Sequence, residues 1–462
     1  MNRTWQRSAI TLTLMVCLGT VAAGTLPASA TAPGAPTTAG VTTASTPALD
    51  PVVTALDRSA YPLRTVEPRG GGADLRPFAR MIGDARVVGV GEATHSSHDF
   101  FALKHRLFRH LVEKKGFRTF ALEAPWSSGL RLNDYVLYGK GNARQILREE
   151  FQGSFLWWNN SDYLALVEWM RAYNRQHPKD PVRFMGNDLG WAGPELYDKV
   201  TDYVARAHPG LRDRFTELYD GLRPTVSAGE YLDAYMTRPL AERRAMAART
   251  AEALDLLREQ SPGRDRAAYD WAVQHATAVD QVARVYSFDI FDDETELAEA
   301  MRYRDQVMAD NTAWWQERTG TKVLLSAHNA HVGYETSEPD RYPRMQGAYL
   351  RDRLGTAYVS VGFTFARGSF NATGPDGQVQ RFTLGPLGAG ANESTLDRVR
   401  YEDYVVDLRT VREPARTWLT RVRPTRSIGT VYPDREYDIA LARNHDILIH
   451  LHDIDAARML DR

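Results

Sequence analysis

Cysteine is almost absent from this chain of 462 residues, because Cys17 is the only one. It lies in an apolar run from Ala9 to Ala23, which follows two arginines and precedes the small-residue site Ala28-Ser29-Ala30. That order predicts a secretory signal peptide over residues 1–30, and hence a secreted or cell-envelope location. Cleavage would remove Cys17, so the mature protein would have no disulfide, no thiolate nucleophile and no cysteine-ligated metal.

Long apolar runs are also missing. The N-terminal run is shorter than the roughly 20 residues that a membrane-spanning helix needs, so we expect no stable membrane association after cleavage. An uncleaved signal anchor is the alternative. Residues 31–50 are rich in Ala, Thr, Pro and Gly and carry no charge before Asp50. Such a segment cannot bury enough apolar surface to fold, and we expect a disordered linker.

An excess of charge of either sign is absent, since 57 basic and 58 acidic residues leave a formal charge of −1. Nothing in this balance favours nucleic acid or an anionic membrane as a partner. The serine-hydrolase pattern Gly-x-Ser-x-Gly and the zinc pattern His-Glu-x-x-His are missing as well. Gly89-Val90-Gly91 is similar to a dinucleotide loop, but Thr94 takes the place of the third glycine and Glu92 would oppose a pyrophosphate.

What the sequence does contain is an alternation of short apolar runs and longer amphipathic segments. We predict strands at 86–90, 118–122, 182–186, 322–326, 357–361 and 446–450, and helices at 99–115 and 163–176. This order predicts an α/β fold, with a mostly parallel sheet and helices on both faces. Residues 195–317 are helical in pattern without a convincing strand, which predicts a large helical insertion or lid.

Polar side chains follow three of these strands. Glu92 and His95 come after the strand at 86–90, Glu123 after 118–122, and His328 and His331 after 322–326. Ligands in open α/β sheets bind at the carboxyl ends of the strands, so the three clusters could converge there. A histidine can take a proton from water near neutral pH, and a carboxylate can fix its tautomer. The pattern therefore predicts a general-base site.

The block Val87–His95 resembles the erythromycin esterase family, and six further segments resemble it in the same order. They are Asp99-Phe100-Phe101, Lys104-His105-Arg106-Leu107-Phe108, Phe120-Ala121-Leu122-Glu123, Met185-Gly186-Asn187-Asp188, Tyr303-Arg304-Asp305 and Ser326-Ala327-His328-Asn329-Ala330-His331. The resemblance extends over about residues 51–462, which we interpret as one erythromycin esterase-like hydrolase domain.

The resemblance implies a carboxylic ester hydrolase that cleaves a macrolactone with water, without a covalent intermediate and without a cofactor or metal. His95 matches the family's general base, Glu92 and Glu123 match its essential carboxylates, and His328 and His331 fall on the segment that supplies further catalytic histidine. The implied partner is a small-molecule ester or macrolactone, and antibiotic resistance is the implied role.

Four further residues match supporting positions of the family. Lys104 stands where a basic helix residue lines the cleft, and Asp188 where a residue braces the site from the third strand. Arg304 and Asp305 match a recurrent pair, for which a buried salt bridge is the alternative. Ser96-Ser97 replaces a frequent Gly-Thr, which would reshape the entrance.

Two other functions stay open on the sequence alone. The same glutamates and histidines are potential ligands of a divalent ion, so the protein could be a metal-dependent hydrolase. It could also be a non-catalytic binding or envelope protein on the same scaffold. An exported relative of intracellular resistance enzymes could also cleave a different ester.

Overall fold

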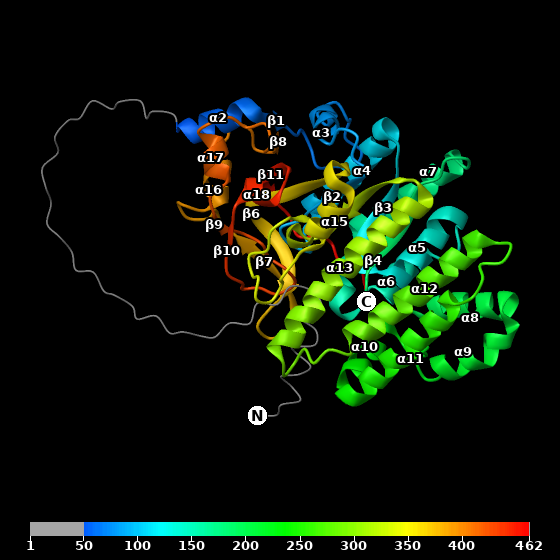
Figure 1. Cartoon of the computed structure of the whole chain (residues 1–462). Coiled ribbons are helices and arrows are strands. Elements are labelled where there is room, and N and C mark those ends of the chain that lie inside the picture. Colours follow the sequence, from blue (N-terminus) through cyan, green and yellow to red (C-terminus); the bar gives the residue numbers. More distant parts are fainter. Residues whose placement is uncertain (1–49, 462) are drawn as a thin grey trace, which may run out of the picture.

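The computed structural model describes residues 50–461. The predicted signal peptide and the predicted linker, apart from Asp50, lie outside the described residues. A twisted sheet crosses the middle of the molecule and helices cover both of its faces (Figure 1). From one edge to the other its strands are β4 (Arg183–Asp188), β3 (Phe117–Pro125), β5 (Lys322–Ser326), β2 (Val87–Val90), β6 (Tyr358–Thr373), β11 (Ile447–Ile454), β8 (Tyr404–Asp407) and β1 (Ala60–Pro62).

The strands from β4 to β11 run parallel. At the edge, β8 and β1 run antiparallel, and β7 (Val379–Leu384) pairs antiparallel with the end of β6. The predicted fold class is confirmed: the protein is mixed α/β with a mostly parallel sheet. All six predicted strands are present, although β3, β6 and β11 continue past their predicted ends. The antiparallel strands β1, β7 and β8 were not predicted.

Burial on both faces explains why the central strands are continuous apolar runs. All four residues of β2 are buried, which is typical of a parallel strand covered on both sides. Val88 and Val90 pack in one core with α4 (His98–Lys115) and α7 (Ser161–Gln176). Val87 packs in a second core with α13 (Glu294–Thr319) and α15 (Gln346–Leu354). The alternation follows the two-residue period of a strand.

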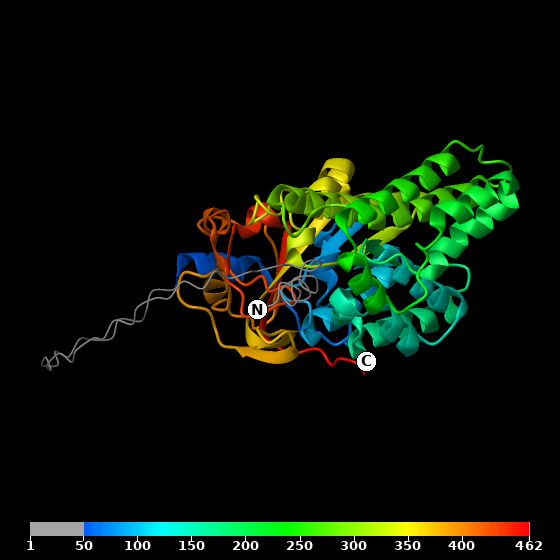
Figure 2. The ribbon, with the colours of Figure 1, turned by 90° about the horizontal axis from the view of Figure 1, so that it is seen from below.

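Between β4 and β5 the chain is helical, as the pattern at 195–317 predicts. This segment contains α8 (Pro194–Ala207), η2 (Pro209–Leu211), α9 (Arg212–Tyr219), α10 (Ala228–Thr237), α11 (Leu240–Arg258), α12 (Arg266–Val285) and α13. Figure 2 shows these green helices extending away from the sheet on one side of the molecule. Their action as a lid stays a prediction.

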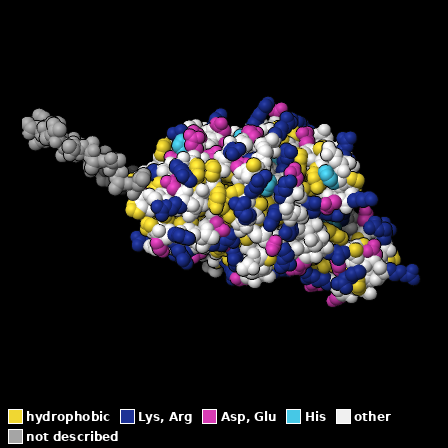
Figure 3. All heavy atoms as spheres, turned by 90° about the horizontal axis from the view of Figure 1, so that it is seen from above, with side chains coloured by type: hydrophobic (Ala, Val, Ile, Leu, Met, Phe, Trp, Pro, Cys, Tyr) yellow, Lys and Arg dark blue, Asp and Glu magenta, His cyan; other side chains and the backbone are white. Residues whose placement is uncertain are grey.

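The remaining elements are short or lie toward the edges. They are α2 (Pro51–Ser59), α3 (Arg76–Met81), α5 (Trp126–Tyr138), α6 (Ala143–Glu150), η1 (Gly153–Trp158), α14 (Asn329–Val332), η3 (Gly355–Ala357), α16 (Asn392–Leu396), α17 (Ala415–Leu419), β9 (Arg423–Thr425), β10 (Tyr437–Ile439) and α18 (Leu441–Asn444). Among the described helices, none is both long and apolar enough to cross a bilayer. On the face in Figure 3, basic and acidic side chains are interspersed rather than separated.

Candidate active site

The three polar clusters predicted from the sequence lie together, because the strands that carry them are neighbours. β5 lies between β2 and β3, and Ser326 at its end is paired with Val90 on one side and Leu122 on the other. The three chains therefore leave the sheet at one level. The five predicted catalytic residues are all buried, with exposed fractions of 0 or 1%: Glu92, His95, Glu123, His328 and His331.

Glu92 connects the first histidine to a buried cation. One carboxylate oxygen, Oε1, accepts a hydrogen bond from His95 Nδ1 at 2.9 Å. The other, Oε2, accepts from Lys104 Nζ. Lys104 is only 1% exposed and comes from the buried face of α4. Lys104 therefore binds Glu92 from the protein interior, and its ammonium is not at the protein surface.

Arg304 from α13 holds the second group of carboxylates. Its Nε lies 3.1 Å from Asp188 Oδ1, and its amino nitrogen Nη2 lies 2.6 Å from Asp188 Oδ2, which is a two-point contact. The same amino nitrogen donates to Glu123 Oε1 at 3.0 Å. Glu123 Oε2 accepts from the backbone N–H of His328 at 2.8 Å. The end of β4 and the end of β3 are thus joined through one guanidinium.

His331 is fixed between two carboxylates. Its Nδ1 lies 2.8 Å from Asp305 Oδ1, and its Nε2 lies 3.3 Å from Glu123 Oε1. Asp305 Oδ1 also accepts from the backbone N–H of Gln346 at 2.7 Å, which fixes the carboxylate. Burial and Arg304 disfavour a charge on His331, but the two carboxylates outweigh them and raise its pKa. Arg304 Nη1, which only donates, also lies 3.3 Å from Nε2, so a proton on His331 depends on Asp305 and Glu123 outweighing this cation.

His328 is held in the neutral state. Its Nδ1 accepts from the backbone N–H of Ala330 at 3.3 Å, so its Nε2 carries the hydrogen and donates to Ile428 O at 3.2 Å. Burial, together with the nearby His95, lowers its pKa well below the ordinary value. Its ring lies 4.9 Å from that of His95, and Trp158 packs edge-on against His95 at 5.2 Å.

His95 Nε2 is buried and has no hydrogen-bond partner among the residues from 50 to 461. The other ring nitrogen is bound to a carboxylate, which accepts hydrogen bonds only and so requires the hydrogen at Nδ1. In the neutral ring, Nε2 then presents a lone pair. A buried nitrogen without a partner is costly in a folded protein and needs an explanation, which a catalytic role would supply; His105 Nε2 and His208 Nε2 are also without partners in the described residues.

The charges of the cluster leave a surplus of one negative charge when His331 is protonated. Four carboxylates, those of Glu92, Glu123, Asp188 and Asp305, face the three cations Lys104, Arg304 and His331. Burial raises the pKa of Glu123, but His331, His95 and Arg304 bring it far below its usual range. Burial raises the pKa of Asp188 despite Arg304. A positive charge that forms on His95 would neutralise the surplus.

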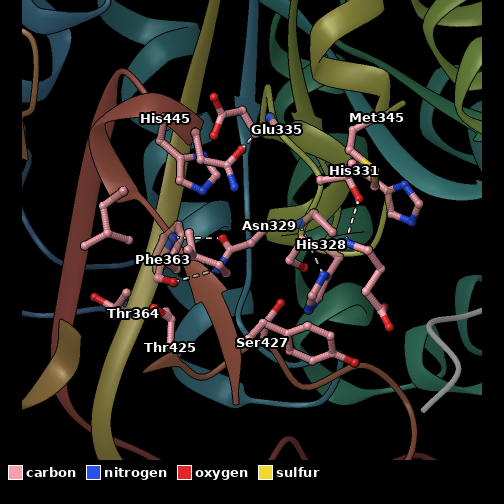
Figure 4. A pocket seen from close by; sticks show the side chains of 18 of the residues that line it. His328, Asn329, His331, Glu335, Met345, Phe363, Thr364, Thr425, Ser427 and His445 are labelled. Carbon is pink, nitrogen blue, oxygen red and sulfur yellow. Dashed lines mark hydrogen bonds between the residues drawn. The ribbon is translucent and has the colours of Figure 1, made fainter. Parts of the chain in front are cut away.

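One cavity borders this cluster. His328 and His331 line it together with Phe363 and Met345, whereas Glu92, His95 and Glu123 do not, and its volume is about 50 Å³. Figure 4 shows the two histidines at one border of it and Phe363 with Thr364 toward another. A second cavity, of about 720 Å³, lies apart from the cluster between η1, α10 and the turn after β6.

Sequence reasoning missed three side chains that touch the cluster. Trp158 packs on His95 and donates through Nε1 to Glu123 O at 2.8 Å. Ser326 accepts a hydrogen bond from Lys104, and the hydroxyl of Tyr163 bonds Ser326, as described below. Two other histidines of this region lie elsewhere on α4: His98 bonds Asp162, which raises its pKa to about 9, and burial lowers the pKa of His105 to about 3.

The arrangement does not resemble a metal site. In the described part of the chain, no group of three or more His, Cys, Asp or Glu side chains is placed to hold a metal ion. Glu92 is paired with Lys104, and Glu123 with Arg304, so both carboxylates already have cationic partners.

Known proteins share sequence and fold with this chain. The family described as erythromycin esterase matches residues 112–454, a range that begins after Glu92, His95 and Lys104. Erythromycin esterase type II of Escherichia coli is 25% identical over 340 residues, which cover 68% of this chain and 77% of that protein.

Two solved structures are similar over most of the chain. A succinoglycan biosynthesis protein is 30% identical with a TM-score of 0.78, over 88% of this chain and 98% of that one. An erythromycin esterase mutant in its open conformation shares the fold at 16% identity, with a TM-score of 0.69 over 86% of this chain and 98% of that one. These matches support an ester hydrolase activity, and the chain belongs to the erythromycin esterase family.

Proposed function

We propose that the protein hydrolyses a carboxylic ester, the lactone of a macrolide or a related cyclic ester, by a water molecule that His95 activates. The observation that carries this proposal is the buried Nε2 of His95, which has no partner in residues 50–461 while Nδ1 is fixed by Glu92. A base must have its lone pair free and its tautomer fixed, and His95 meets both conditions.

In the proposed reaction, His95 Nε2 takes a proton from water as the water oxygen attacks the ester carbonyl carbon. The imidazolium that forms is stabilised by Glu92 and by the surplus negative charge of the cluster. Collapse of the tetrahedral intermediate breaks the bond to the alcohol oxygen, and His95 returns its proton to that oxygen. The products are a carboxylic acid, which releases its proton to water, and an alcohol; in a lactone they are parts of one opened ring.

No covalent enzyme intermediate is needed in this sequence. Hydrolysis in H₂¹⁸O under single-turnover conditions should place the label in the product acid in the first turnover. This labelling excludes an enzyme carboxylate as the nucleophile, whose own oxygen would enter the first product, but a seryl ester would give the same result. An acyl-enzyme of that kind would be trapped by acid quenching and detected as an added mass on the protein. Detection of that mass would contradict the water mechanism.

The cavity beside His328 and His331 is too small, at about 50 Å³, to identify the substrate. Support for a macrolactone comes from the Escherichia coli relatives, which are named for erythromycin. The structural neighbour named for succinoglycan biosynthesis, at 30% identity, makes an acylated polysaccharide the second candidate. Macrolide resistance follows as a role only if the first class is cleaved.

A screen of macrolides, simpler lactones and acylated polysaccharides, read by mass spectrometry as a gain of 18 Da or a released acid, would identify the class. The His95→Ala variant is the control for contaminating esterases. A parallel arm with a strong chelator tests the metal alternative, which predicts loss of turnover and recovery with added ion. Absence of turnover for every class would favour the non-catalytic alternative.

We also propose that the mature protein begins near Thr31 and acts outside the cytoplasm, on the basis of the N-terminal sequence alone. N-terminal sequencing of the protein from culture medium and envelope fractions tests this. Intact protein starting at Met1 in the cytosol would contradict it.

A further inference from the structure

Lys104 is held by more than its ion pair with Glu92. An ammonium has three hydrogens to donate, and the three acceptors around Nζ are Glu92 Oε2, Ser326 Oγ at 3.0 Å and Ala327 O at 3.3 Å. Ser326 Oγ lies in turn 3.1 Å from the hydroxyl of Tyr163. Both residues are buried, Ser326 at 0% exposure and Tyr163 at 2%.

The two hydroxyls come from the end of β5 and from the first turn of α7. Ser326 is the last residue of β5, which lies between β2 and β3. The loop that carries Glu92 follows the neighbouring strand β2. Tyr163 lies in the first turn of α7, where Asn160 caps the helix by accepting from the backbone N–H of Asp162 and Tyr163 at 2.9 Å each. Trp158 and Phe101 pack against the Tyr163 ring.

We propose that Ser326 and Tyr163 are positioning residues, which hold Lys104 against Glu92 and thereby keep the Glu92 carboxylate in the orientation that His95 requires. Glu92 uses one oxygen for Lys104 and the other for His95, so a shift of the ammonium turns the carboxylate away from the imidazole. This inference deepens the proposed function and rests on it for its catalytic meaning.

The surroundings of Lys104 also bear on its charge. Burial lowers the pKa of Lys104, and the carboxylates of Glu92 and Glu123 oppose that effect. Ser326 adds an acceptor that binds the protonated amine. The other titratable group that faces this site is Tyr163, whose pKa burial raises well above its ordinary value, so it stays neutral.

A different role for Ser326 is a nucleophile activated by Lys104. That role requires a neutral amine to accept the serine proton, whereas Lys104 is paired with a carboxylate. It also requires that Ser326 Oγ reach the ester carbon, although the residue is enclosed between two strands. We therefore assign Ser326 to positioning, and the nucleophile becomes an outcome of the test.

The test compares Ser326→Ala, Ser326→Thr and Tyr163→Phe with the wild type in two measurements. The first is the pH titration of the Lys104 ¹³Cε NMR signal in protein labelled with ¹³C-lysine, which needs no turnover. The chain has seven lysines, and Lys104→Met identifies the signal. The second is the pH profile of kcat and KM with an ester substrate.

We expect Ser326→Ala to move the Lys104 titration, and the alkaline limb of kcat, down by about one pH unit, because the charged amine loses an acceptor. Separately from this shift, kcat at neutral pH should fall about tenfold with little change in KM, because Glu92 is held less firmly in the orientation that His95 requires. Tyr163→Phe should give a smaller shift in the same direction. Ser326→Thr keeps the hydroxyl and should behave much like the wild type. Should Ser326→Ala fail to fold, Tyr163→Phe decides.

Matched controls remove a buried hydroxyl elsewhere: Ser128→Ala, whose hydroxyl bonds Glu150, and Tyr404→Phe, whose hydroxyl bonds Leu396 O. They should leave both readouts unchanged. Unmoved Lys104 titration in both Ser326→Ala and Tyr163→Phe would overturn the inference, and so would an acyl group trapped on Ser326. If the wild type cleaves no ester, the proposed function fails while the NMR titration still decides whether the hydroxyls hold Lys104.

Discussion

Replacement of Arg304 should destabilise the folded protein strongly. It is 4% exposed and is the cation that pairs with both Asp188 and Glu123, which are each 1% exposed. Removing one partner of a buried pair costs about 3–5 kcal/mol, because the other charge is left without compensation. Arg304→Met leaves Asp188 without its cationic partner, while Glu123 keeps His331 and the His328 N–H, so we expect a loss of about 3 kcal/mol in the free energy of unfolding.

Equilibrium urea unfolding, followed by tryptophan fluorescence and circular dichroism, measures this loss. Arg304→Lys keeps the charge but not the two-point contact and should lose less. The loss in Arg304→Met should shrink as the pH falls, since Glu123 without Arg304 takes up a proton more readily in the folded state. Adding Asp188→Asn should recover part of the stability. A loss under about 1 kcal/mol that does not vary with pH would refute the reasoning.

Two further predictions concern Glu92 and the buried histidines. Glu92→Gln should reduce kcat about 100-fold or more, because the amide keeps the shape but not the charge that stabilises a protonated His95; an unchanged kcat would contradict this assignment. Burial lowers the pKa of His275 and His445 to about 3, from 6.5. The unfolded chain therefore binds more protons below pH 6.5, and each histidine should remove about 1.4 kcal/mol of stability per pH unit between those values. In urea titrations at pH 7, 6 and 5, the stability of His445→Gln should fall less steeply with decreasing pH than that of the wild type. A slope equal to that of the wild type would exclude His445 as a source of the decline.

The members of the candidate site could be predicted because each follows a strand directly in the sequence. Glu92, Glu123 and His328 need only the rule that parallel strands end at one edge of the sheet. The pairing within the cluster could not be predicted in this way. Whether Lys104 reaches Glu92, and whether Arg304 reaches Asp188, depends on how α4 and α13 are rotated on the sheet.

The strands that sequence reasoning missed or shortened have a physical reason too. β6 continues for 16 residues, but glycines at 362 and 368 interrupt its apolar run. Gly368 has φ +124°, and a Cβ there would lie 2.0 Å from Ile454 O, so the continuation depends on a contact with β11. β7 is half exposed along its length, and its pattern therefore lacks the continuous apolar run of the central strands.

The central claim is that His95 is the general base, and the kcat of His95→Ala on a cleaved ester tests it most directly. The account predicts a fall in kcat of about 10²–10⁴-fold, with KM changed little and the unfolding midpoint within the range of other single substitutions. A folded His95→Ala protein that hydrolyses the same ester at nearly the wild-type rate would contradict it.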